Sequence, residues 1–199
     1  MTQRVDPYSI EIRYMLDRMG QLLYRERPRR VRVYSDDREI VLATARRLGG
    51  DYMLSVETPA LADDVRGVLG IRVEVAGDAP ADAAFAPLSL GRSATPRERV
   101  LIGAVRNPFS YKTLRYPGQV SAAGMRALAW ARRAYRVDTI VGMYPPHCAG
   151  LLALAGLVGR WGAASYFRLT DLAMRHIYAG APAWRLSYVV IFAGRRAGQ

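Results

Sequence analysis

The chain has 199 residues, of which 51% are hydrophobic and 23% charged, so it can fold around a sizeable core. Its single cysteine, Cys148, excludes a disulfide scaffold and a multi-cysteine zinc module. The net charge is +12, and all of this excess lies in residues 99–199, because residues 1–98 hold fifteen arginines and fifteen acids. Such a field favours an anionic partner, although a solvated surface in an arginine-preferring protein would give the same number.

The sequence predicts no membrane-spanning segment. No apolar run reaches the ~18–20 residues that a spanning helix needs. The polar start of the chain, residues 1–6, lacks the apolar core of a signal peptide. We therefore expect a cytoplasmic protein.

The first half of the chain alternates between strand and helix patterns. Apolar residues at helical spacing predict a helix over 6–24, and a turn of four arginines around Pro28 follows it. Two further helices are predicted at 36–48 and 58–69, and a short helix or turn at Thr95-Pro96. Short apolar runs predict strands at 31–35, 52–56, 71–75, 83–90 and 100–105. Strands separated by helices favour right-handed βαβ units and a parallel sheet.

The second half continues this pattern and then changes it. A helix from Ser121 to about residue 135 precedes a strand at 137–144. Two helices are predicted next, at 148–161 and 167–178, before a last strand at 187–193. We divide the chain into an N-terminal helix and basic turn, residues 1–30, and a single α/β domain, residues 31–199, with a helical insertion at 148–180.

Three stretches, together with this element order, carry a resemblance to a known family. They are DAAFAPLSL at 82–90, VLIGAVRNPFSY at 100–111 and YVVIFAGRR at 188–196. Over residues 8–196 the chain resembles the class I S-adenosylmethionine-dependent methyltransferases. The resemblance implies a Rossmann-like methyltransferase fold: a mostly parallel seven-stranded sheet whose last strand is antiparallel beside the fifth. Ligands of such sheets bind at the carboxyl ends of the strands where the strand order reverses, here around Ser35 and Ser89.

The resemblance also implies S-adenosylmethionine as cofactor and assigns residues to it. Glu57 stands where the family places an acid for the ribose hydroxyls, and Asp78 where an acid faces the adenine amine. A carboxylate suits the ribose because it accepts two hydrogen bonds from a diol. Ser35 and Ser89 complete the expected cofactor site. As residues alone, the two acids fit a helix N-cap or a loop equally well.

The first strand departs from the family pattern. The family expects an acid followed by a glycine-rich turn, but this chain has Val-Tyr-Ser-Asp-Asp-Arg-Glu at 33–39 and no glycine between Pro28 and Gly49. Asp36 and Asp37 would lie near the cofactor's carboxylate, which is unfavourable unless Arg38 compensates. This departure predicts a cofactor site that is altered or lost.

Candidate catalytic and substrate residues follow the fifth and sixth strands. His147 could act as a general base because imidazole titrates near neutral pH, or it could cap the next helix. The neighbouring Cys148 could be a nucleophile or a small buried residue. Two histidines and one cysteine give no metal-ligand spacing. An aromatic and basic loop could contact a substrate, a partner or a nucleic-acid backbone, or simply connect strand and helix, through Asn107, Tyr111, Lys112, Arg115 and Tyr116.

Three functions remain open from the sequence. The first is methyl transfer to a small apolar or anionic acceptor. The second is a catalytically degenerate methyltransferase-like subunit or scaffold that binds a protein or an anionic partner through its basic C-terminal half. The third is association with nucleic acid. The apolar insertion, edged with Trp161 and Arg160, could be a lid or core layer, a protein contact or a peripheral membrane contact.

Overall fold

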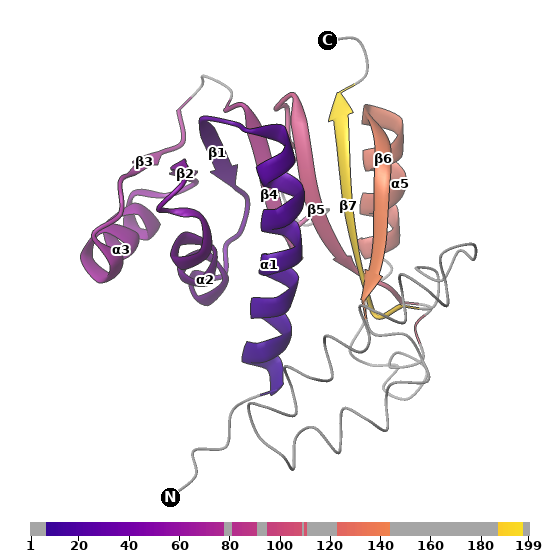
Figure 1. The fold of residues 1–199 in the computed structure, drawn as a ribbon, viewed down its shortest axis with the longest axis horizontal. Coiled ribbons are helices and arrows are strands. Elements are labelled where there is room, and N and C mark those ends of the chain that lie inside the picture. Colours follow the sequence, from indigo (N-terminus) through magenta and orange to yellow (C-terminus); the bar gives the residue numbers. More distant parts are fainter. Residues whose placement is uncertain are drawn as a thin grey trace, which may run out of the picture.

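The computed structural model describes residues 7–77, 81–90, 95–108, 110, 123–143 and 187–196. Within these residues seven strands form one sheet with the order β3-β2-β1-β4-β5-β7-β6 (Figure 1). The strands are β1 Arg30–Val33, β2 Met53–Val56, β3 Val73–Val75, β4 Ala83–Pro87, β5 Val100–Arg106, β6 Tyr135–Met143 and β7 Val189–Arg196. The helices are α1 Pro7–Glu26, α2 Arg38–Leu48, α3 Pro59–Leu69 and α5 Ala123–Ala134.

The strand directions confirm the fold that the resemblance implied. The strands β1 to β5 pair in parallel, whereas β7 lies antiparallel between β5 and β6. The chain therefore has the Rossmann-like fold of class I methyltransferases, with the strand order reversing between β1 and β4. We call the edge at which the parallel strands end the carboxyl edge, and the edge at which they begin the amino edge.

Local sequence signals explain where the helices begin and end. Asp37 caps α2, and Thr58 caps α3, with Pro59 in its first turn. Gly70 ends α3 in the left-handed region at φ 62°, which glycine reaches without steric cost. Both helices therefore start at the carboxyl edge and run back to the amino edge, as crossover helices of a parallel sheet must.

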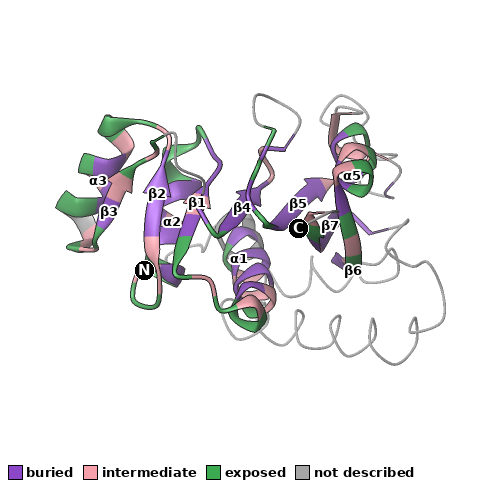
Figure 2. Cartoon of the chain, turned by 90° about the horizontal axis from the view of Figure 1, so that it is seen from above, coloured by how far each residue is buried: buried purple, intermediate pink, exposed green. Residues whose placement is uncertain are grey.

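The helices cover the two faces of the sheet unequally. Buried side chains of α1, α2 and α3 pack on one face in a single cluster. The other face packs against α5, which lies behind β6 and β7 in Figure 1. All five residues of β4 are buried, and Figure 2 shows this strand in purple at the centre of the molecule. The core therefore lies on both sides of β4 and β5.

The described residues depart from the sequence predictions at several boundaries. The strand β1 ends at Val33 rather than at Ser35, because the turn that caps α2 has already begun there. The helix α5 runs directly into β6 at Tyr135. Residues 95–99 contain no helix at the predicted Thr95-Pro96 start. The two predicted insertion helices, and Ser121, lie outside the described residues.

Asp82 links the starts of β1 and β4 at the amino edge. Its carboxylate accepts the backbone N–H groups of Arg29 at 2.8 Å and Arg30 at 2.9 Å. These hydrogen bonds, the one from Arg30 first, hold the pKa of Asp82 below its usual value. The start of β1 is therefore fixed to the start of β4.

Among the described residues, no helix is long and apolar enough to cross a membrane.

Candidate functional site at the carboxyl edge

At the exit of β1, polar side chains accept hydrogen bonds from the backbone amides of the same turn. Ser35 is buried, and its Oγ accepts the Asp37 N–H at 3.2 Å. The Oδ1 of Asp37 accepts the N–H of Glu39 at 3.0 Å and that of Ile40 at 3.3 Å. The first amides of a helix are a ready-made anion site. In α2 these amides are already satisfied by a carboxylate that belongs to the chain.

The exit of β4 folds onto the exit of β1. Leu88 adopts the left-handed region at φ 61°, and its N–H donates to the Ala104 carbonyl at 3.0 Å. This turn places the Ser89 hydroxyl against the backbone carbonyl of Tyr34, to which it donates a hydrogen bond. Ser35 and Ser89 therefore lie close together where β1 and β4 end, with both hydroxyls bonded to backbone groups of the β1 exit, and their binding of a cofactor stays a prediction.

Glu57 is the open group at this edge. It follows β2 directly and is half-buried. The Oγ1 of the next residue, Thr58, accepts the Leu61 N–H at 3.3 Å, so Thr58 and not Glu57 caps α3. Glu57 makes no ion pair with another side chain in the described ranges. Its carboxylate therefore remains available for a ligand.

The cation that was expected to balance Asp36 and Asp37 is engaged elsewhere. The Arg38 guanidinium binds Asp64 of α3 through two hydrogen bonds, of 2.7 and 3.1 Å. This pair raises the pKa of Arg38 and lowers the pKa of Asp64. Both Asp36 and Asp37 are exposed. Arg38 therefore contributes less to the field at the β1 exit than its position in the sequence suggested.

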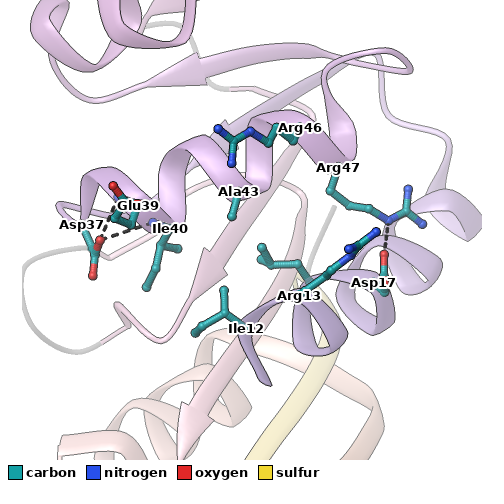
Figure 3. A pocket seen from close by; sticks show the side chains of 10 residues that line it. Ile12, Arg13, Asp17, Asp37, Glu39, Ile40, Ala43, Arg46 and Arg47 are labelled. Atoms are coloured by element: carbon teal, nitrogen blue, oxygen red, sulfur yellow. Dashed lines mark hydrogen bonds and ion pairs between the residues drawn. The ribbon is translucent and has the colours of Figure 1, made fainter. Parts of the chain in front are cut away.

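A groove of about 630 Å³ runs between α1 and α2 from this edge (Figure 3). Asp37 and Glu39 lie at one end of it, and Ile40 and Ala43 line its middle. At the other end Arg47 binds Asp17 at 2.5 Å. The groove's volume is within the range of small-molecule sites. The sequence does not predict this groove because the pairing of α1 with α2 depends on tertiary packing.

A buried cluster below the β1 exit was also missed. The Tyr34 hydroxyl donates to the Glu98 carboxylate, with both oxygens at 3.0 Å, and the Arg97 N–H donates to it at 2.8 Å. Burial raises the pKa of Tyr34 well above its usual value, and the charge of Glu98 adds to this. The Arg32 guanidinium lies 5.1 Å from the centre of the Tyr34 ring, and its Nε is buried without a partner. Tyr34 therefore binds inward, away from any ligand at the edge.

The other predicted residues are only partly described. Asn107 lies at the end of β5, where its Nδ2 donates to the Ser187 carbonyl at 2.9 Å and its N–H to the Tyr188 carbonyl at 2.8 Å. It thus joins β5 to the start of β7, and its role toward a substrate stays a prediction. The remaining predicted site residues lie outside the described ranges: Asp78, Tyr111, Lys112, Arg115, Tyr116 and His147.

S-adenosylmethionine fits this edge only in part. Glu57 offers an open carboxylate of the kind that binds ribose hydroxyls. At the β1 exit, however, the methionine carboxylate would meet Asp36 and Asp37, and the α2 amides that could receive it are occupied by Asp37. The methionine end of the cofactor therefore does not fit the usual position. Among the described residues, no group of three or more potential metal ligands occurs.

Comparison with solved structures returns matches at low sequence identity, several of which are described as methyltransferases. YjhP from E. coli is 16% identical over 99% of this chain and 94% of its own, with a TM-score of 0.47. A SAM-dependent methyltransferase from Archaeoglobus fulgidus is 13% identical over 91% and 92%, with a TM-score of 0.45. One from Geobacter sulfurreducens, in complex with S-adenosyl-L-homocysteine, is 16% identical over 92% and 90%, at 0.44. No family model and no curated protein matches the sequence.

Proposed function

We propose that this chain is a catalytically degenerate methyltransferase-like module that binds an anionic or protein partner. The observation that carries the proposal is Asp37, whose carboxylate fills the N-terminus of α2. In a Rossmann-like sheet this helix terminus, after the first strand, is where an anionic part of the ligand is received. In this chain the place holds a built-in anion.

Electrostatics gives the size of the effect. Two unit charges about 4 Å apart near a protein surface interact by about 4 kcal/mol. A methionine carboxylate held that close to Asp37, with the α-ammonium and sulfonium farther away, would lose about a thousandfold in affinity, since each 1.4 kcal/mol is tenfold. Arg38 offers little relief because Asp64 holds its guanidinium. This repulsion supports a protein that has kept the fold and given up ordinary cofactor binding.

A second function, methyl transfer to a small apolar or anionic acceptor, is supported by Glu57. Its carboxylate is open at the β2 exit, and the Oγ1 of Thr58 performs the capping that Glu57 could otherwise have supplied. An acid kept free at this position is what a ribose diol requires. In this case the cofactor would bind by its nucleoside end, with the methionine end directed away from Asp37.

Titration calorimetry with S-adenosylmethionine separates the two functions. The degenerate module should give no saturable heat at millimolar cofactor. Binding with a dissociation constant below about 100 μM, lost in Glu57→Gln, would instead establish the second function. Asp63→Asn is the matched control, because it removes an exposed carboxylate of α3 outside this edge.

The charge explanation has its own test. The double variant Asp36→Ser, Asp37→Ser removes both carboxylates and keeps a residue that caps α2 well. If repulsion closes the site, this variant should gain measurable affinity for S-adenosylmethionine, and the gain should shrink at high salt. A double variant that also fails to bind S-adenosylmethionine would contradict the repulsion argument. The titration of the wild-type protein would still decide between the two functions.

A further inference from the structure

The amino edge of the sheet gathers arginines from both halves of the chain. The turn after α1 leads into β1 here, and β7 ends beside it, since Arg195 binds Glu26 of α1 through two hydrogen bonds of 3.1 Å. The N–H of Arg196 donates to the Arg99 carbonyl at 2.8 Å, and Arg196 pairs with the first residue of β6. Exposed arginines at this edge include Arg25, Arg27, Arg29, Arg99 and Arg136.

These five exposed arginines make no ion pair with an acid in the described part of the chain. The ion pairs at this edge use Arg195 with Glu26 and Arg30 with Glu74, at 3.1 Å each. The charge of Arg99 lowers the pKa of Asp82, whose oxygen is already bound to backbone amides. The edge therefore keeps an unbalanced positive field. Such a field attracts polyanions and speeds their association.

An aromatic hollow adjoins this charge. It has a volume of about 270 Å³ and lies between the last turn of α1 and the start of β2. Tyr24, which is 67% exposed, and Tyr52 both line it, together with Arg25, the acid Asp51 and Arg47, which is paired with Asp17. An exposed aromatic ring beside arginines is the arrangement on which unpaired bases stack while the backbone meets the cations.

We propose that the amino edge binds single-stranded nucleic acid. Arg25, Arg27 and Arg29 contact phosphates, and a base stacks on Tyr24 in the hollow. The planar guanidinium fork matches phosphate oxygens bidentately. A membrane surface fits less well, because Tyr24 and Val75 are the only exposed large hydrophobic residues in the described ranges. Interfacial anchors need a broader apolar face.

The binding test uses a fluorescein-labelled oligouridylate of about 16 nucleotides, the upper site size of a small binding domain. Fluorescence anisotropy at salt concentrations from about 50 to 200 mM gives affinity and salt slope. Arg25→Gln with Arg29→Gln should reduce the slope by about 1.4, since each lost phosphate contact on a single strand contributes about 0.7. The control pair, Arg13→Gln with Arg126→Gln, removes the same charge from parts of α1 and α5 nearer the carboxyl edge and should leave the slope almost unchanged.

The base contact is tested separately. Tyr24→Ala should weaken binding of the oligouridylate about tenfold, whereas Tyr24→Phe keeps the ring and should bind normally. An abasic oligomer of the same length should bind wild type and Tyr24→Ala alike. Equal binding of oligouridylate by wild type and Tyr24→Ala would overturn the stacking role.

Three further results would overturn the proposal as a whole. One is the absence of saturable binding at about 50 mM salt, where phosphate contacts are strongest. Another is a loss in the control pair as large as that in the amino-edge pair. The third is tighter binding to phosphatidylserine vesicles than to the oligouridylate, with the same dependence on Arg25 and Arg29, which would assign the edge to a membrane.

Discussion

The two edges of the sheet differ in how many of their described polar groups already bind the protein itself. At the carboxyl edge, where sheets of this type bind ligands, Ser35 and Asp37 bind amides of their own turn, and Ser89 binds the Tyr34 carbonyl in the neighbouring turn. At the amino edge, Arg25, Arg27 and Arg29 make no ion pair with any other described residue. The fold alone would therefore place a ligand site at the carboxyl edge, whereas the unpaired arginines favour a site at the amino edge.

A buried cluster joins the two edges through the second face of the sheet. Tyr34 follows β1 at the carboxyl edge, and its hydroxyl reaches Glu98, which precedes β5 at the amino edge. The Tyr135 hydroxyl donates to the carbonyls of Pro96 at 2.8 Å and Glu98 at 3.1 Å. The cluster holds residues 96–98 against the sheet without a helix. The contribution of this cluster and of each edge to stability can be measured by substitution.

The largest effect is expected at alkaline pH, because two buried phenols titrate together in the link between the edges. Burial first, and then Glu98, raises the pKa of Tyr135 to about 12, and the pKa of Tyr34 is also raised. Their stabilisation is present below the unfolded tyrosine pKa of about 10 and is lost as pH rises through the folded values. The free energy of unfolding, measured with urea, should therefore fall steeply between pH 10 and 12. A Tyr135→Phe variant should show a shallower fall, and an unchanged slope would contradict the assignment.

Next in size is Tyr34→Phe at neutral pH. The variant keeps the ring but leaves the buried Glu98 carboxylate with only the Arg97 N–H of its two donors. Loss of a hydrogen bond to a buried charged group costs about 1.5–3 kcal/mol of unfolding free energy. Urea unfolding should show a lower midpoint at an unchanged m-value. Tyr24→Phe, which alters an exposed hydroxyl, should stay at wild-type stability, and equal stability of both variants would argue against the cluster.

A smaller effect is expected at the carboxyl edge from Asp37→Ala. The variant leaves the Glu39 and Ile40 amides of α2 without their acceptor, which typically costs about 1 kcal/mol. Asp37→Ser should recover most of this loss because serine also caps helices. The neighbouring Asp36→Ala serves as the control, since Asp36 does not cap the helix. Thermal unfolding would compare the three variants.

The smallest change in stability should come from Glu26→Gln, which releases Arg195 at the amino edge. The Arg195 side of this pair is exposed, and ion pairs at the surface add little to folding, so the unfolding midpoint should move only slightly. The released guanidinium, however, adds a free cation to the proposed nucleic-acid surface. Oligouridylate affinity should rise, with a salt slope steeper by about 0.7. A weaker affinity would contradict the placement of the surface.

The sequence predicted the sheet well because its signals are local. The Thr58-Pro59 start and Gly70 end of α3 were found at their observed positions, since a capping hydroxyl, a fixed φ and a left-handed glycine are properties of single residues. The continuous apolar run of β5 predicted a strand buried on both faces, and all but its last residue are buried. The position of β7 came from the family resemblance and is confirmed.

The candidate site was harder to predict because its state depends on pairings distant in sequence. The proximity of Arg38 to Asp36 suggested a compensating charge, whereas the structure pairs it with Asp64, twenty-six residues away. The sequence showed the arginine turn around Pro28, but the zero net charge of residues 1–98 did not show that Arg25, Arg27 and Arg29 make no ion pair with another described residue. Charge arithmetic along the chain placed the basic face in the second half alone, but the amino edge draws on both halves.

Among the described residues, the positive charge at the amino edge and the negative charge of Asp36 and Asp37 at the carboxyl edge form an electric dipole along the strands. A polyanion at a distance attracts the amino edge and repels the exposed carboxylates of Asp36 and Asp37, so electrostatic torque turns the protein before contact. Bound in this orientation, the protein would present the carboxyl edge and the mouth of the α1–α2 groove outward. The amino edge of the sheet would thus hold the chain to its partner, while the carboxyl edge stayed accessible to a second molecule.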